Sequence, residues 1–244
     1  RHIPGQDGFP DVDPQSHGLV ELSTVGKGGL VFVQQEGDID PKILAEIPDF
    51  FTPEQKYFKE VNFEDEANWK LLAETSMEGY HIKALHKKSF YPYGLDNTTV
   101  VETFGPHSRL TFPFRRIEKL RDVKPEERRT NGLITSVYQI FPITQISILS
   151  QHSSLVLLEP ISPTRTAHVV YQLTNKGSNG VKITVEEAER DASFVKESGL
   201  DEDRGAACAI QDSLSSAANS HLTFGHFEQA IVHFHEGLEK HLPQ

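Results

Sequence analysis

Residues 132–174 read GLITSVYQIFPITQISILSQHSSLVLLEPISPTRTAHVVYQLT, and this stretch decides the fold. It is rich in β-branched, aliphatic and aromatic residues, which favour strands, and proline and polar residues punctuate it. Strands are predicted at 132–141, 145–150, 154–161 and 166–174. Because the links between them are short, consecutive strands are expected to pair as an antiparallel meander.

The strand pattern extends toward the N-terminus. Segments 98–104 and 108–114 have the same character, and segments 57–63 and 30–33 predict two further strands. The insert 115–129 interrupts the series with residues of both charges, so it is expected to form a solvated surface helix. Residues 1–27 are rich in Gly, Pro, Asp and His and are expected to be irregular or a linker.

Helices are predicted on both sides of the strand region. A short helix is expected within 40–51, and a longer one begins at Asn68 and carries an interrupted apolar stripe toward Leu85. After a loop at 175–180, the chain is expected to be helical at 185–197, from 201 to about 219, and at 228–241. Strands followed by helices indicate an α+β architecture in which an antiparallel sheet grips long C-terminal helices.

Composition excludes several classes of protein. The formal net charge of −11 argues against a nucleic-acid binder, and no apolar run approaches the ~20 residues of a membrane-spanning helix. A single cysteine, Cys208, makes neither an internal disulfide nor a cysteine-rich zinc or iron–sulfur site. A reducing cytoplasm is therefore the expected compartment.

A candidate metal site comes from two histidines. His81 and His86 are five residues apart and follow a carboxylate at Glu78. On an ideal helix, residues five apart point about 140° apart, so both rings face one ion only if a π-bulge or a helix break intervenes, for which 83–84 is the expected place. Gly79 in the same segment indicates a local distortion or a close approach. The alternative is two unrelated histidines, one packed and one facing solvent.

This segment resembles the iron-binding motif of the Rieske non-haem iron oxygenases, in the catalytic domain of their α-subunit. That motif is an Asn, an acid-x-Tyr-His and a second His five residues on, which match Asn68, Glu78, Tyr80, His81 and His86. The family's third ligand is an aspartate eight residues before a glutamine on a C-terminal helix. Further similarities lie in the stretches 28–33, 225–228 and 234–235, so the resemblance covers nearly the whole chain.

The resemblance implies a role for each matching residue. His81 and His86 would bind Fe(II) as neutral imidazoles, and Asp203, eight residues before Gln211, would be the carboxylate of a facial triad. Glu78 matches the acid that links the iron to a Rieske-cluster histidine of a neighbouring subunit. Many members have aspartate there, and as an acid beside the ligand Glu78 would also orient His81. Asn68 and Tyr80 match positions that shape the site.

Each of these residues also has a plain structural interpretation. Asp203 lies in the acidic trio 201–203, which is typical of a solvated helix N-terminus. Glu78 can be an ordinary surface acid, and Asn68, which precedes Trp69, can be a helix N-cap.

The same resemblance implies cofactors and partners. Family enzymes receive electrons from a 2Fe-2S Rieske cluster held by Cys-x-His and Cys-x-x-His motifs, and neither motif occurs here. We therefore expect 1–27 to be a linker following a Rieske domain absent from this chain, and 28–244 to be the mononuclear-iron catalytic domain. NAD(P)H would supply electrons through a reductase, with or without a ferredoxin, and the full-length protein would be a homotrimer.

The family's helix-grip fold, which is Bet v 1/START-like, places a pocket between sheet and helices. Its candidate lining residues are equally well explained as core: Phe104, Phe112, Phe114, Val137, Ile148 and Leu157. The predicted function is hydroxylation of an organic substrate, aromatic or otherwise apolar, by a monooxygenase or ring-hydroxylating dioxygenase of aromatic catabolism. The alternatives are a helix-grip ligand-binding domain with a vestigial metal site and a zinc-dependent hydrolase.

Overall fold

The computed structural model describes residues 4–177 and 182–242. The chain divides into two compact units between Thr52 and Pro53. The N-terminal unit holds the short 3-10 helix η1 (Gln6–Gly8), a two-stranded antiparallel sheet of β1 (Ser23–Lys27) and β2 (Leu30–Gln34), and α1 (Pro41–Leu44). Gly28 and Gly29, both at positive φ, make the turn between the two strands.

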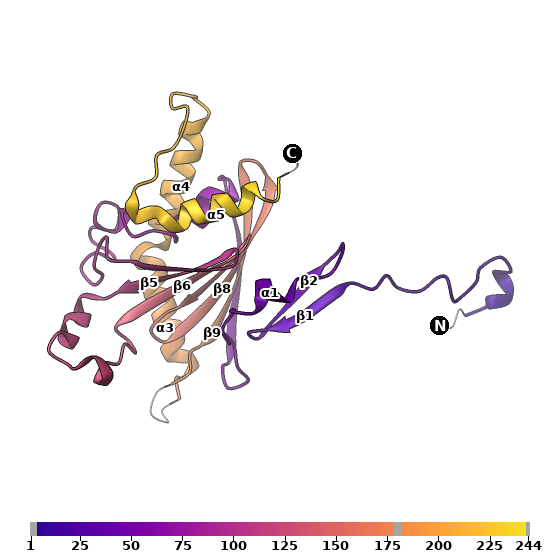
Figure 1. Cartoon of the computed structure of the whole chain (residues 1–244), viewed down its shortest axis with the longest axis horizontal. Coiled ribbons are helices and arrows are strands. Elements are labelled where there is room, and N and C mark those ends of the chain that lie inside the picture. The colour runs from indigo at the N-terminus through magenta and orange to yellow at the C-terminus, as the bar shows by residue number, and fades with distance from the viewer. Residues whose placement is uncertain (1–3, 178–181, 243–244) are drawn as a thin grey trace. The chain divides into compact units, whose positions relative to one another are not determined.

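The second unit is built on a seven-stranded antiparallel sheet with the strand order β3-β9-β8-β7-β6-β5-β4 (Figure 1). Its strands are β3 (Tyr57–Asp65), β4 (Val100–Phe104), β5 (His107–Pro113), β6 (Ile134–Ile140), β7 (Thr144–Ile148), β8 (His152–Ser162) and β9 (Arg165–Thr174). From β4 to β9, each strand pairs with the next along the chain, which confirms the predicted meander. β3 then pairs with β9 at the far edge.

Long helices follow the sheet, as predicted. They are α3 (Val185–Val195), the π-helical turn η5 (Lys196–Leu200), α4 (Asp201–Leu214) and α5 (Gln229–Glu239), with the 3-10 turn η6 (His226–Glu228) before the last. Thr184 begins α3 with a capping box to Glu187. α3 contacts β8 and β9, α5 contacts β4 and β5, and α4 packs against α2 (Trp69–Glu74), which itself contacts β8. This is the helix-grip arrangement.

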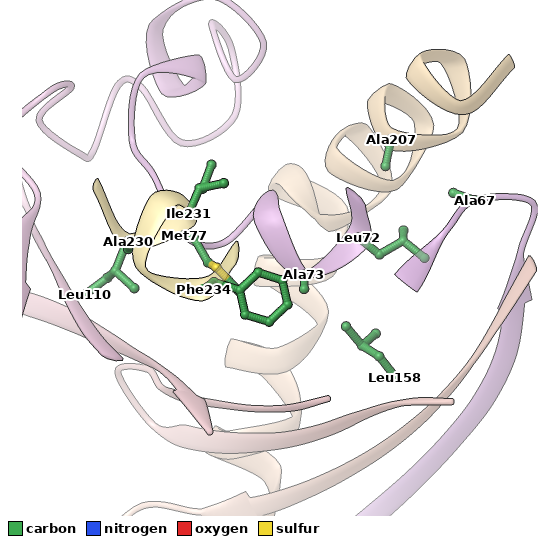
Figure 2. Packing of buried hydrophobic residues seen from close by; sticks show 10 residues of the cluster. All are labelled: Ala67, Leu72, Ala73, Met77, Leu110, Leu158, Ala207, Ala230, Ile231 and Phe234. Carbon is green, nitrogen blue, oxygen red and sulfur yellow. The ribbon is translucent and has the colours of Figure 1, made fainter. Parts of the chain in front are cut away.

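The core lies between this face and the helices. Its buried members come from the sheet, from α2 (Trp69–Glu74) and the residues flanking it, and from α4 and α5 (Figure 2); they are Ala67, Leu72, Ala73, Met77, Leu110, Leu158, Ala207, Ala230, Ile231 and Phe234. Alternate residues of each strand point to opposite faces, so Leu110 and Leu158 identify the helix-facing side. Burial of such side chains contributes about 1.5–3 kcal/mol each, which fixes the sheet against the helices.

Several predicted elements differ in the structure. The helix expected from Asn68 toward Leu85 was wrong in length, because α2 ends at Glu74 and a separate 3-10 turn, η2 (His81–Lys83), follows. The Thr75 and Ser76 hydroxyls bond back to carbonyls of Leu72 and Ala73 as the helix ends.

Other differences are smaller. The insert at 115–129 forms two 3-10 helices, η3 (Arg115–Leu120) and η4 (Pro125–Glu127), rather than one helix. The helix within 40–51 is only the four-residue α1, and α4 stops at Leu214. The stretch 1–27 contains strand β1 at its end. The predicted loop 175–180 lies partly outside the described residues.

No helix in the described ranges is long and apolar enough to cross a bilayer.

Candidate metal centre

The short turn η2 and the residues after it bring the rings of His81 and His86 together, edge to face. The regular helix α2 has already ended at Glu74, and the three-residue η2 ends at Lys83, where the break was predicted, with turns following to His86. The two imidazole centroids lie 5.0 Å apart with planes at 66°. Gly79, which precedes η2, makes the close approach that its position suggested, since a Cβ there would crowd the Thr99 hydroxyl. The break therefore removes the 140° divergence of a regular helix.

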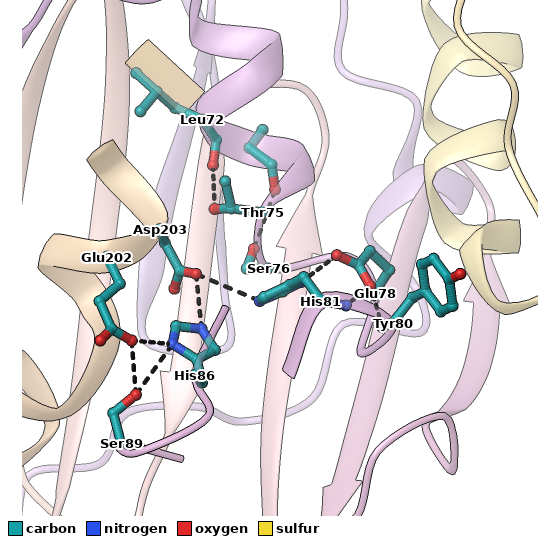
Figure 3. Close-up of polar contacts among 11 residues, drawn as sticks. Leu72, Thr75, Ser76, Glu78, Tyr80, His81, His86, Ser89, Glu202 and Asp203 are labelled. Carbon is teal, nitrogen blue, oxygen red and sulfur yellow. Dashed lines mark hydrogen bonds and ion pairs between the residues drawn. The ribbon is translucent and has the colours of Figure 1, made fainter. Parts of the chain in front are cut away.

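Asp203, in the first turn of α4, is the third member of the group (Figure 3). Its Oδ1 lies 2.8 Å from Nε2 of His86 and 3.3 Å from Nε2 of His81. One ligand atom from each of the three residues lies within 4.8 Å of the others, a spacing that could hold a metal ion. His86 is 1% exposed at its side chain, and Asp203 is 14% exposed. The π-helical turn η5 immediately precedes α4, and such turns are frequent at functional sites.

Two outer carboxylates orient the rings. Glu78 contacts Nδ1 of His81 and also accepts from the backbone N–H groups of Tyr80 and His81. Glu202 Oε2 lies 2.8 Å from Nδ1 of His86. Because an ionised carboxylate only accepts, each Nδ1 carries the proton, and each Nε2 faces Asp203. This carboxylate–histidine pairing is the usual support of metal-binding imidazoles.

The Oδ1 atom of Asp203 fits a metal ligand better than a hydrogen-bond acceptor. It is buried and forms ion pairs with both Nε2 atoms, at 2.8 and 3.3 Å, but neither contact has the geometry of a hydrogen bond. An unsatisfied buried carboxylate oxygen is costly. A cation bound by the two imidazole nitrogens and this oxygen would satisfy all three atoms. Two nitrogens and one oxygen form the donor set of the two-His-one-carboxylate face.

The electrostatics of the cluster favour positive charge at its centre. Burial alone would lower the pKa of His81, but its contacts with Asp203 and Glu78 raise that pKa to about 9. Burial opposes the charged form of His86 as well, and contacts with Asp203 and Glu202 raise its pKa. Burial would raise the pKa of Asp203, but the two imidazoles lower it. The field that favours a proton on either ring also favours a cation between them.

The close packing of Phe90 supports His86 from another side. The Phe90 and His86 rings meet edge to face with centroids 4.8 Å apart. Gly199, in η5, lies against the same phenylalanine so closely that a Cβ there would overlap the ring. The π-helical turn thus touches the metal group through one aromatic side chain.

The other two motif residues stand apart from the three ligand atoms. Asn68 is the N-cap of α2 and accepts from the N–H of Lys70, as its structural interpretation predicted. The Tyr80 side chain is 60% exposed and stacks on Phe227, pointing away from the histidines in Figure 3. Only the backbone N–H of Tyr80 reaches the site, through Glu78.

The predicted pocket lining is partly wrong, because the strand register places its residues on two opposite faces of the sheet. Phe104, Ile148 and Leu157 alternate with helix-facing residues such as Val101 and Leu158, so they lie on the opposite face and cannot line a pocket beneath the helices. Val137 pairs with Leu110 on the helix-facing side, where Phe112 also packs. Phe114, just beyond β5, lies under the Arg116 guanidinium.

None of the six predicted residues lines either of two cavities found in the described part of the chain. One of about 400 Å³ lies between α2, α4 and α5, with Leu71, Phe224 and His235 among its walls. The other, of about 150 Å³, is bordered by Gly79, Thr99 and Phe227.

Sequence reasoning missed Glu202 and Ser89. The Ser89 hydroxyl donates to Glu202 Oε2 at 2.6 Å, which holds that carboxylate against His86. From the sequence alone, Glu202 is one of three consecutive acids typical of a helix N-terminus. Glu202 could have been identified from its position next to Asp203, because a helix that directs Asp203 at the histidine segment brings the neighbouring residue close to it as well.

Comparisons with known proteins agree with this geometry. The family model described as the ring hydroxylating alpha subunit (catalytic domain) matches residues 54–244. Among curated proteins, the glycine betaine monooxygenase oxygenase subunit of Chromohalobacter salexigens is 36% identical over 89 residues, which are 34% of this chain and 20% of that protein.

Solved structures share the fold. A quaternary ammonium Rieske monooxygenase, described with carnitine oxidation by gut microbiota and inter-subunit electron transfer, matches 97% of this chain and 66% of its own, with a TM-score of 0.73 and 15% identity. Naphthalene 1,2-dioxygenase from Rhodococcus sp. bound to indole matches 98% of this chain and 71% of its own, with a TM-score of 0.66 and 14% identity. The chain thus spans about two thirds of the length of these solved chains.

Proposed function

The chain belongs to the family of ring-hydroxylating α-subunit catalytic domains, and from that premise we propose that His81, His86 and Asp203 hold one Fe(II) at which dioxygen oxidises a small organic substrate. The observation that carries this proposal is the convergence of two Nε2 atoms and one buried, unsatisfied carboxylate oxygen. Bound Fe(II) would supply the activation of dioxygen. Three protein ligands leave coordination positions open for small molecules.

The protein's own part is to hold the ligands in the correct state. Glu78 and Glu202 keep the Nδ1 protons in place, so both Nε2 lone pairs are directed at the ion. Burial of His86 and Asp203 excludes bulk water from one side of the centre. These roles need no movement of the backbone, because the three atoms already lie within 4.8 Å of one another.

Electrons would come from a Rieske cluster outside these residues, since the chain has one cysteine. We propose that Glu78, which contacts His81, is the point at which a neighbouring subunit's cluster approaches, in a trimer served by a reductase and NAD(P)H. Inter-subunit electron transfer is described for one solved relative. A cytoplasmic location stays a prediction.

The experiment is metal analysis of anaerobically purified protein. We expect about one iron per chain, lost in His81→Ala and in Asp203→Ala. His235→Ala is the matched control, because His235 also pairs with a carboxylate, Glu74 at 2.8 Å, outside the cluster. Normal iron content in both ligand variants would end the proposal. Reconstitution that supports activity with zinc but not with iron would favour the hydrolase alternative.

For the substrate, a quaternary ammonium compound is a second candidate beside an aromatic or apolar one. The 36% identity to a glycine betaine monooxygenase subunit favours it. Binding is testable without electron transfer, through the visible spectrum of the Co(II)-substituted protein. A spectral change with glycine betaine but not with naphthalene or benzoate would select the quaternary ammonium class, and the reverse would select the aromatic class.

A further inference from the structure

The loop that joins β3 to α2 is bound to α4 at two points. Asp65, at the end of β3, pairs with Arg204, the residue after the ligand Asp203. Asn68, at the start of α2, donates its backbone N–H to Oε1 of Gln211 at 2.9 Å. Residues 204 and 211 are seven apart, so they lie on one face of α4 about 10 Å from each other.

The contact between Asp65 and Arg204 is strongly directional. Nε and Nη2 of Arg204 donate to the two carboxylate oxygens at 2.8 and 2.7 Å, a bidentate geometry. Asp65 is 8% exposed at its side chain. Phe63 lies 4.0 Å below the guanidinium and stacks on His168, whose Nε2 is 3.0 Å from Asp65. A planar fork held in this way fixes both the rotation and the axial position of the helix.

The second contact lies two turns further along. Gln211 accepts from Asn68, whose side chain donates to the carbonyl of Pro163 at 2.7 Å. Between the two contacts, Ala207 of α4 is 1% exposed and Ala67 of the loop is fully buried, both within the core cluster. Small side chains at these positions let helix and loop approach closely. The loop 65–68 therefore runs along one face of α4 with a polar contact at each end.

We propose that Asp65, Arg204 and Gln211 are positioning residues that set where Asp203 stands against His81 and His86; the inference rests on the proposed metal centre. Both histidines belong to one short segment, but Asp203 reaches them from a different element. A one-residue change in the register of α4 would rotate Asp203 by about 100°. The π-helical turn η5 lies between α3 and α4 and is wider than a regular turn, so the register of α4 is offset from that of α3.

A purely structural ion pair makes a different prediction. The Asp65 side chain is 8% exposed and that of Arg204 is 31% exposed, so removing Arg204 leaves a buried carboxylate without its partner and should destabilise the protein. Replacing both partners by apolar residues of similar volume often restores stability. If the pair serves only stability, metal affinity should recover together with stability. If the fork sets helix register, the apolar pair should restore stability and leave metal affinity low.

The experiment uses Co(II) alone as the probe, with affinity and the visible spectrum measured under conditions where each metal-free variant is folded by circular dichroism. Arg204→Lys keeps the charge and loses the fork, and we expect at least tenfold weaker Co(II) binding. The double variant Asp65→Leu/Arg204→Met should be as weak with near-normal stability. Gln211→Ala should lose twofold to fivefold.

Two matched controls accompany them. Arg165→Gln removes a neighbouring, exposed pair with Glu64, whose partners lie away from α4, and should leave Co(II) affinity unchanged. Asp212→Ala changes an exposed acid beside Gln211 and should also have no effect.

Co(II) binding by the wild-type protein and by Asp203→Ala distinguishes failure of the proposed metal centre from failure of the positioning role. Absence of Co(II) binding by the wild type would overturn the proposed centre itself. Tight binding by the wild type, lost in Asp203→Ala but retained in Arg204→Lys and in the folded double variant, would overturn the positioning role alone.

Discussion

Two buried histidine–carboxylate groups in this protein differ in one respect that separates a structural pair from a candidate metal centre. His152, on β8, lies 2.7 Å from Asp191 of α3, and the same carboxylate oxygen accepts the backbone N–H of Gln151. The Asp191 oxygen is therefore satisfied by hydrogen bonds from His152 and Gln151. At the metal centre, outer carboxylates take the Nδ1 side of His81 and His86, while the oxygen between the two Nε2 atoms has no hydrogen bond among the described residues.

The comparison shows that burial of histidine beside an acid is not by itself a sign of metal chemistry. His152 and His86 are each 1% exposed at their side chains, so burial does not distinguish them. The useful signal is convergence, in which two rings from one segment and one acid from another direct ligand atoms at a common point. Among the described residues, this cluster meets the criterion for a metal-holding group.

The largest loss of metal affinity is expected from removing an outer carboxylate. Glu202→Ala leaves Nδ1 of His86 without its acceptor, so we expect Co(II) affinity to fall 10- to 100-fold. Glu202→Gln should lose less, because an amide oxygen still accepts a hydrogen bond. Asp212→Ala on the same helix removes one negative charge and serves as control. Equal affinities in all three would mean that Glu202 does not orient the ligand.

Disrupting the pair of His152 and Asp191 should lower stability and leave metal affinity unchanged. Asp191→Ala removes two hydrogen bonds to a largely buried carboxylate, and we expect a loss of about 1–2 kcal/mol in the free energy of unfolding. Urea denaturation of the metal-free protein measures it. Co(II) affinity of the folded variant should equal that of the wild type. A fall in metal affinity would show that α3 contributes to the centre and that the two groups are coupled.

The smallest effect is expected in the free energy of unfolding at acidic pH. Burial would raise the pKa of Asp191, but hydrogen bonds from His152 and Gln151 outweigh it and lower that pKa below 3.8. A group whose pKa is lower in the folded state stabilises the protein above its unfolded pKa, and this contribution disappears as pH falls through the folded value. The stability difference between wild type and Asp191→Asn should therefore shrink below about pH 4, as checked by urea midpoints. A constant difference down to pH 3 would contradict it.

Much of the sheet was predictable because its determinants are local. Segment 166–174 has the composition of a strand, and the structure has β9 at Arg165–Thr174. The metal group was also predictable as a set, since His81, His86 and Asp203 follow from a motif resemblance and the structure brings them together.

What escaped prediction depends on contacts that the sequence pattern does not reveal, most of them between residues far apart in the chain. The early end of α2 depends on local hydroxyl bonds and on packing that no periodicity reveals. The face to which Phe104, Ile148 and Leu157 point is set by strand register, which one sequence leaves open. The sequence does not distinguish Glu202 from any other acid in the first turn of a helix, because its contacts with His86 and Ser89 are made only in the folded chain.

The contact between Gly199 and Phe90 has a consequence for how sequences of this kind can diverge. The ring fills the space that a side chain at 199 would need, and it also rests on His86. Bulk can therefore be gained at 199 only when it is given up at 90. Homologous chains should vary at these two positions together, and a scan that changes one position at a time will score both as intolerant although the pair is exchangeable.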